Sequence, residues 1–217
     1  PPSRLICLEN THNRCLGMPL DINYINDVAD IARNNNMSVH IDGARIFNAA
    51  VATGSSVSDL TKEVESVSFC LSKGLSAPSG SLLCGESSFI QRARFNRKAL
   101  GGGMRQAGIL AAAGIVALNV MSKKIVQDHQ NAKKLADGIS KIDGINLELE
   151  KIKTNIIYFK LDHPKVNSSA LLEFMGKKNI RFFELAPNWF RLVTHSGISN
   201  KSIDYVVNEF DHFFAKA

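Results

Sequence analysis

Three short polar stretches of this sequence could carry chemistry, and each of them directly follows an apolar run. They are Glu9-Asn10-Thr11-His12, Asp42-Gly43-Ala44-Arg45 and Ser72-Lys73-Gly74. In an open parallel sheet, ligand-binding groups gather at the carboxyl ends of the strands. We therefore expect a carboxylate, an arginine and a lysine along one rim of one sheet.

A lysine in that position suits Schiff-base chemistry. Beside an apolar wall the ammonium group of Lys73 loses solvation, which lowers its pKa and leaves a fraction as the free amine. Pyridoxal phosphate (PLP) requires such a lysine, a carboxylate facing its pyridine nitrogen, and donors for its phosphate. Asp42 could supply the carboxylate, and the guanidinium of Arg45 is suited to bidentate binding of an amino-acid carboxylate.

Each of these residues also has a plain structural interpretation. Asp42-Gly43 is a common turn dipeptide. Arg45 could pair with Asp42 across a helical turn, and most lysines in loops are simply solvated. Only their combination at neighbouring strand ends favours the cofactor interpretation.

A run of three glycines, Gly101 to Gly103, precedes Arg105. Glycines let backbone N–H groups approach an anion closely, and the start of a helix favours negative charge. The Gly-Lys-Ser/Thr sequence of a Walker motif is missing, so a nucleotide site is not indicated. We expect an anion site here or, alternatively, the closely packed entry of a helix.

The elements that must position these residues alternate between strands and helices. Strands are predicted at residues 4–10, 37–41, 67–71 and 81–85, and helices at 19–36 and 44–53. This order predicts an α/β fold, a mostly parallel sheet with helices on both faces. A long Ala-rich helix is expected to run from Gly101 past Lys123. Alternating strands and two helices after Gly144 predict a smaller α+β domain, so we expect domains at 1–125 and 126–217, with the boundary between 120 and 145.

Composition excludes several classes of protein. The net charge is +6, but Lys and Arg are scattered rather than clustered among aromatics, so no nucleic-acid partner is expected. No stretch predicts a membrane span or a signal sequence. The cysteines form no CxxC pairs, which favours buried thiols in a reducing cytosol over disulfides or a metal site. They are Cys7, Cys15, Cys70 and Cys84.

Five stretches carry a resemblance to a known family. They are "LENTHN", "HIDGARIFNA", "SFCLSKGLSAPSGSLLCG", "RKALGGGMRQAGILAAAG" and "RLVTH", in this order. The chain closely resembles the low-specificity threonine aldolases, PLP enzymes of the aspartate-aminotransferase-like fold (fold type I), over essentially its whole length. The resemblance implies cleavage of L-threonine and L-allo-threonine to glycine and acetaldehyde, in a cytoplasmic homo-oligomer built as a dimer of dimers.

The resemblance also implies roles for individual residues. Lys73 is the Schiff-base lysine, and Asp42 is the partner of the pyridine nitrogen. Arg45 and Arg191 hold the carboxylate of the amino-acid substrate.

Further positions match less directly. Lys98 and Arg105 resemble basic positions that reach the cofactor phosphate from a neighbouring subunit. Thr11 and His12 lie in a loop beside the cofactor. The resemblance gives no role to His129 or His195.

The chain departs from this family in two places. Family members carry a long stretch before "PPSRLICLEN" that holds the phosphate-binding turn, the histidine that stacks on the cofactor and a substrate-contacting serine. Ser196-Gly197 stands where relatives usually have an acidic residue. The first departure predicts an exposed sheet edge and exposed apolar faces, unless a separate N-terminal segment or another chain covers them.

Two alternatives to the aldolase assignment stay open. One is a catalytically impaired homologue whose role is subunit assembly. The other is a different fold type I activity, such as a β-eliminating lyase or an aminotransferase.

Overall fold

The computed structural model describes residues 1–216 and consists of two compact units. The first contains Pro1–His12 and Pro19–Ile125. The second contains Asn13–Met18 together with the chain from Val126 onward. Nothing in the sequence indicated that the short segment 13–18 belongs with the C-terminal part of the chain.

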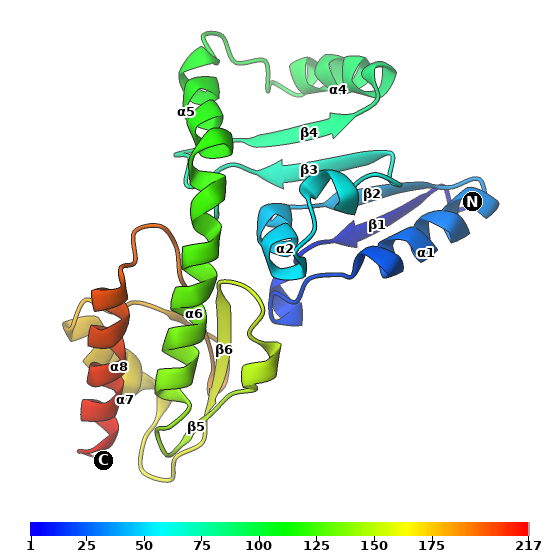
Figure 1. Cartoon of the computed structure of the whole chain (residues 1–217). Coiled ribbons are helices and arrows are strands. Elements are labelled where there is room, and N and C mark those ends of the chain that lie inside the picture. Colours follow the sequence, from blue (N-terminus) through cyan, green and yellow to red (C-terminus); the bar gives the residue numbers. More distant parts are fainter. Residues whose placement is uncertain (217) are drawn as a thin grey trace. The chain divides into compact units, whose positions relative to one another are not determined.

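The first unit is built on a four-stranded sheet in the order β1-β2-β3-β4 (Figure 1). Its strands are β1 (Leu5–Glu9), β2 (Ser38–Asp42), β3 (Ser66–Cys70) and β4 (Ser81–Gly85). β1, β2 and β3 are parallel, whereas β4 is antiparallel to β3. The sheet is therefore mostly parallel, as predicted.

Three helices cover one face of this sheet: α1 (Ile22–Asn34), α2 (Ile46–Thr53) and α3 (Val57–Leu60). α1 begins because the Asp21 side chain accepts a hydrogen bond from the backbone N–H of Asn23. Apolar residues spaced by three or four positions form its buried stripe, which packs against the inward-facing side chains of β2. α2 ends at Gly54, whose φ of 70° is left-handed.

The opposite face is only thinly covered. α4 (Ser87–Ala99) lines a groove on this side with residues from β1, β2 and β3, among them Leu5, His40 and Ser66. Leu5 is still 55% exposed. Cys7 on the same face and Cys84 on the edge strand are exposed. The prediction that these thiols are buried was therefore wrong, because apolar runs at the sheet edge have no second layer over them.

The glycine run ends one helix rather than beginning another. α4 stops at Ala99, Gly101 has a φ of 84°, and α5 (Gly108–Asn119) starts only five residues after Gly103. The chain then breaks at Val120 before η2 (Met121–Lys124) and α6 (Ile125–Ile139). The predicted single helix was wrong. Consecutive glycines, which have the poorest helix propensity after proline, precede its start, and the break at Val120 divides the remainder.

In length and apolar composition, the described helices fall into two cases relative to a membrane span. None of them alone has both the length and the apolar composition needed for a span. The helices on either side of Val120 meet that requirement only when they are counted together.

The second unit is an antiparallel sheet covered by helices. Its strands, in the order β5-β6-β8-β7, are β5 (Ile145–Asn146), β6 (Ile156–Leu161), β8 (Trp189–Val193) and β7 (Phe183–Ala186). α6, α7 (Ser168–Lys177) and α8 (Asn200–Phe214) complete it, with two short 3-10 turns, η1 (Asn13–Cys15) and η3 (Leu149–Lys151). The rings of Phe159 and Phe190 stack at 4.9 Å, and Phe210 meets Phe159 edge-on at 5.8 Å.

Candidate active site

The carboxyl ends of β1, β2 and β3 lie at one edge of the first sheet. Glu9 pairs with Asp42, and Asp42 pairs with Ser68. Just beyond the strands, the backbone N–H of Asn10 donates to the carbonyl of Asp42 at 2.9 Å. The first unit therefore brings the ends of these strands together, as the sequence predicted.

The Asp42-Gly43 dipeptide forms a turn after β2, and its backbone also connects to β3 through a hydrogen bond. The N–H of Gly43 donates to the carbonyl of Ser68 at 2.7 Å. A Cβ on Gly43 would lie 3.0 Å from that carbonyl and 2.9 Å from Cβ of Ile46, so only glycine allows the approach. The Asp42 carboxylate accepts from the N–H of Ala44 at 3.0 Å, which fixes its direction at the rim.

The loop that carries Lys73 is held at several points. Leu71 and Leu75 are buried, and the N–H of Ser76 donates to the carbonyl of Lys73 at 2.9 Å. The backbone at Gly74 lies so close to the buried Asn48 of α2 that a Cβ would be 2.8 Å from its side-chain oxygen. A defined loop therefore presents the lysine just beyond the end of β3.

The side chain of Lys73 is exposed. The apolar wall that we expected beside its ammonium group does not cover it. Its charge acts instead on Cys70. Burial raises the pKa of the Cys70 thiol, but the hydrogen bond with Ser72 (Sγ–Oγ 3.3 Å) and the Lys73 ammonium lower it more, so the net direction is downward.

The end of β1 contributes two buried polar side chains. Asn10 and Thr11 are fully buried, and within residues 1–216 the amide nitrogen of Asn10 and the hydroxyl of Thr11 have no hydrogen-bond partner. His12 lies 3.2 Å from the carboxylate of Glu9. Since buried polar groups are normally paired, the two unpartnered groups beside Asp42 fit a site that receives a polar ligand.

Arg45, Lys98 and Arg105 differ in their burial and in the elements that carry them. Arg45 is partly buried and is the N-cap residue that precedes α2, where its carbonyl accepts from the backbone N–H groups of Asn48 and Ala49. Lys98 lies in the last turn of α4 and folds over Gly103, where a Cβ would collide with its side chain. Arg105 is exposed between α4 and α5. The glycines therefore make room for Lys98, and they follow the end of α4 instead of opening a helix.

Arg191 lies in the second unit, on β8. It stands directly across from Tyr158 of β6, and its Nη1 donates to the side-chain oxygen of Asn13 at 2.7 Å. Asn13 was not among the predicted site residues. The motif "LENTHN" ends on it, which was the only signal in the sequence that could have drawn attention to it.

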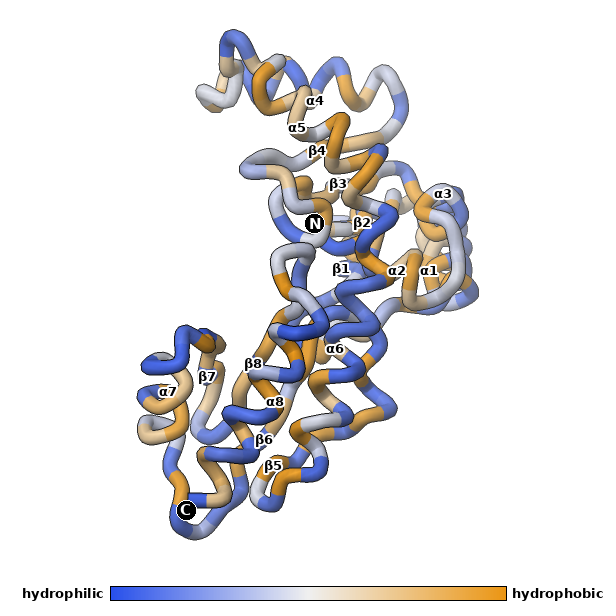
Figure 2. The backbone as a smooth tube through the Cα atoms, turned by 60° about the vertical axis from the view of Figure 1, so that its left-hand side comes forward, coloured by the Kyte–Doolittle hydropathy of each residue, from blue (hydrophilic) through white to orange (hydrophobic). Residues whose placement is uncertain are grey.

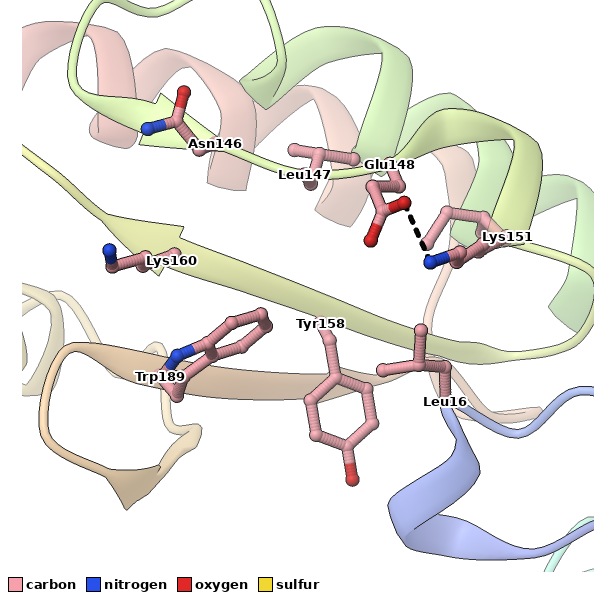
Figure 3. A pocket seen from close by; sticks show the side chains of 9 residues that line it. Leu16, Asn146, Leu147, Glu148, Lys151, Tyr158, Lys160 and Trp189 are labelled. Atoms are coloured by element: carbon pink, nitrogen blue, oxygen red, sulfur yellow. Dashed lines mark ion pairs between the residues drawn. The ribbon is translucent and has the colours of Figure 1, made fainter.

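A cavity of about 250 Å³ lies in the second unit, between β5, β6, β8 and the 13–18 segment (Figure 3). Tyr158 and Trp189 form one side of it, and Glu148 and Lys151 the other, paired at 2.7 Å. This pairing raises the pKa of Lys151. None of the predicted catalytic residues lines this cavity.

Two perturbed groups lie on α6. Burial raises the pKa of Asp128 to about 6, against an opposing effect of His195. Burial lowers the pKa of His129 to about 4. No group of three or more His, Cys, Asp or Glu within the described residues is arranged to hold a metal ion.

The comparisons with known proteins agree with this fold and this order of motifs. The chain belongs to the beta-eliminating lyase family, whose model matches residues 1–162. It is 41% identical over 215 residues to a probable low-specificity L-threonine aldolase 2 of Arabidopsis thaliana, covering 99% of this chain and 61% of that protein. The resemblance to the low-specificity threonine aldolases is thereby confirmed.

Solved structures share the fold at low identity. A putative aromatic amino acid beta-eliminating lyase/threonine aldolase from Exiguobacterium sp. 255-15 matches with a TM-score of 0.82 at 16% identity, covering 96% of this chain and 61% of that chain. A serine palmitoyltransferase from S. paucimobilis with bound PLP matches with a TM-score of 0.74 at 14% identity, covering 99% of this chain and 56% of that chain. The chain spans about 60% of the length of its Arabidopsis thaliana and Escherichia coli relatives.

Proposed function

We propose that this chain is part of a PLP-dependent aldehyde-lyase that cleaves L-threonine and L-allo-threonine to glycine and acetaldehyde. The observation that carries the proposal is the rim of the first sheet. Asp42 and the Lys73 loop follow neighbouring parallel strands, beside the buried amide nitrogen of Asn10 and the buried hydroxyl of Thr11, which have no hydrogen-bond partner within residues 1–216. The curated aldolase relatives support the choice of reaction.

The residues of this rim fit the cofactor. Neither Lys73 nor Asp42 takes part in the ion pairs described within residues 1–216. Lys73 would hold PLP covalently through its amine, and Asp42 would keep the pyridine nitrogen protonated. When bound, PLP accepts the electron pair that remains on Cα as the Cα–Cβ bond breaks. Thr11 and His12, which follow β1, would line the same site.

The substrate carboxylate would be held by Arg45 and Arg191. A guanidinium binds a carboxylate through two parallel hydrogen bonds, which fixes orientation as well as position. Orientation matters here because only a Cα–Cβ bond held perpendicular to the cofactor ring can be cleaved readily. The removal of the β-hydroxyl proton needs a base, and no residue is assigned to that step.

Lys98 and Arg105 would serve a neighbouring subunit. Both are exposed basic residues at the end of α4 and just after it, so they are available to an anion on another chain. We propose a homo-oligomer in which they reach the phosphate of the adjacent site. The expected cytoplasmic location belongs to the same proposal.

The test is chemical labelling of the chain incubated with PLP. Borohydride reduction followed by peptide mass spectrometry should place the cofactor on the peptide that contains Lys73. Lys73→Ala should abolish labelling, and Lys62→Ala, an exposed lysine elsewhere in this unit, should leave it unchanged. Asp42→Asn should retain labelling but lose about a hundredfold or more in acetaldehyde release. A label on another lysine, or none, would contradict the proposal and favour a role in subunit assembly.

The family description favours β-elimination as the second candidate reaction. Elimination releases a keto acid and ammonia, whereas aldol cleavage releases an aldehyde and glycine. Assaying both products from L-threonine and L-serine separates the two. Keto-acid release without acetaldehyde would replace the aldolase proposal, and keto-acid formation only with an added amino acceptor would indicate an aminotransferase.

A further inference from the structure

One asparagine in the second unit contacts both members of a cross-strand pair. The side-chain oxygen of Asn13 accepts from Nη1 of Arg191 at 2.7 Å. The backbone carbonyl of the same residue accepts from the Tyr158 hydroxyl at 2.9 Å. These two bonds join residues that are 178 and 145 positions apart in the sequence.

The sheet explains why one residue can make both bonds. Tyr158 on β6 stands directly opposite Arg191 on β8, so their side chains leave the same face of the sheet. Figure 3 shows the Tyr158 hydroxyl pointing away from Glu148 and Lys151, on the side of Leu16. Asn13 belongs to this same 13–18 segment, which lies on the second unit.

The segment is anchored at its other end as well. The buried Thr154 hydroxyl donates to the carbonyl of Gly17 at 3.0 Å. Gly17 has a φ of 70°, and a Cβ there would lie 2.8 Å from the Thr154 hydroxyl and 3.0 Å from Ile156. Only glycine therefore lets the segment lie this close to the sheet, which keeps Asn13 in register with Arg191.

The contact orients Arg191 without neutralising it. An amide oxygen is an uncharged acceptor, and the ion pairs described within residues 1–216 do not include Arg191. Its Nε is buried and has no hydrogen-bond partner among the same residues. The guanidinium thus keeps its full charge and unused donors, in a fixed plane.

We propose that Asn13, supported by Tyr158, is the positioning residue that makes Arg191 select ligands with a carboxylate. The proposal rests on the proposed function, in which Arg191 binds the substrate carboxylate. A free guanidinium rotates about its side-chain bonds, and a two-point bond to a carboxylate requires that freedom to be lost. Asn13 removes it before the ligand arrives.

The experiment compares two ligands of the PLP-loaded protein, L-threonine and L-threoninol, in which CH₂OH replaces the carboxylate. Binding is followed by the change in visible absorbance. Asn13→Ala should weaken L-threonine binding about tenfold, because an oriented charged hydrogen bond is lost, and leave L-threoninol binding unchanged. Asn146→Ala, an exposed asparagine of the same unit, should change neither. Equal weakening of both ligands by Asn13→Ala would show a merely structural role and overturn the proposal.

Two further variants sharpen the outcome. Asn13→Asp keeps the acceptor but adds a competing carboxylate, so L-threonine binding should fall further than in Asn13→Ala. Tyr158→Phe should give a smaller loss in the same direction, whereas Tyr205→Phe should give none.

The variant Arg191→Lys distinguishes the proposed role of Arg191 in substrate binding from the proposed positioning role of Asn13. If this variant does not weaken L-threonine binding, the proposed role of Arg191 itself fails. If it does so selectively while Asn13→Ala has no effect, the proposed function stands and only the positioning role of Asn13 is wrong.

Discussion

The two units differ in how their large apolar side chains are placed. In the second unit the largest apolar side chains face one another, and Phe159, Phe190 and Phe210 are completely buried. In the first unit several of comparable size face solvent: Phe95 is 74% exposed and Ile109 is 76% exposed. Figure 2 shows apolar residues recurring along α5, and only two residues of that helix, Gly114 and Ala117, are buried.

This difference teaches that the second unit closes its own core, whereas the first presents surfaces suited to a further layer. A helix that is apolar on all sides is normally buried. α5 is apolar on all sides but largely exposed. The edge strand β4 also carries exposed apolar side chains, since Leu82 and Leu83 are about 40% exposed. We predicted exposed apolar faces from the sequence, and the first unit has them.

The largest effect is expected from opening the closed core. Phe159→Ala should destabilise the second unit by about 3–5 kcal/mol, because it removes a ring that packs against three others and leaves a cavity. Trp189 is the only tryptophan of the sequence and lies in this unit, so its fluorescence during urea unfolding measures the change. Phe183→Ala, at a side chain 67% exposed, is the matched control and should change the midpoint little.

Polar substitutions on the exposed apolar surface of α5 should weaken the association between chains and leave the free energy of unfolding unchanged. Ile109→Gln combined with Val116→Gln should weaken self-association about a hundredfold, since each apolar side chain buried contributes about 1.5–3 kcal/mol. Sedimentation velocity measures this, with Trp189 unfolding as the control for stability. Unchanged association would show that α5 is not the surface through which the chains meet.

The free energy of unfolding should depend on pH through two neighbouring residues of α6, Asp128 and His129, whose contributions change with pH in opposite directions. The pKa of Asp128 is raised to about 6, so the folded state binds more protons than the unfolded state below that value, and its contribution falls as pH rises from about 4 to 6. The pKa of His129 is lowered to about 4, so its contribution rises from about 4 to 6.5.

Replacing either residue should leave the pH dependence that the other one contributes. Relative to wild type, the stability of Asp128→Asn should increase more steeply with pH between 4 and 6, and that of His129→Gln less steeply. Urea midpoints from Trp189 fluorescence across this range measure both slopes. Parallel pH profiles for all three proteins would contradict the assignment.

The smallest effect is expected at the start of α7. The side chain of Asn167 accepts from the N–H of Ala170 at 2.8 Å, and Asn167→Ala should cost about 1 kcal/mol. Asn167→Ser restores a capping oxygen and should recover most of this. A destabilisation in the serine variant as large as in the alanine variant would rule out capping as the cause.

Much of the first sheet could be predicted because its strands are short apolar runs. β4 was predicted at residues 81–85 and lies there. α4 could not be predicted, since none of its residues is buried and no apolar stripe marks it. Burial of Cys7 was wrong for the same reason, because the pattern of a strand does not reveal whether a second layer covers it.

In the candidate site, too, the features set by local sequence could be predicted, and those set by distant residues could not. The strand-end rule located Asp42 and the Lys73 loop, because it depends only on local order and parallel pairing. The exposure of Lys73 depends on neighbours distant in the sequence. The bond between Asn13 and Arg191 joins positions 178 residues apart, and no local pattern encodes it.

That separation also has a consequence for how the chain is made. At typical synthesis rates of about 5–20 residues per second, Asn13 is added to the growing chain roughly 9–36 s before Arg191. Contacts of long sequence separation form late, because a large loop must close first. The contacts of the 13–18 segment with β8 must therefore form after those of β1, β2 and β3, which are translated earlier. Asn13 can therefore orient Arg191 only after β8 has been translated.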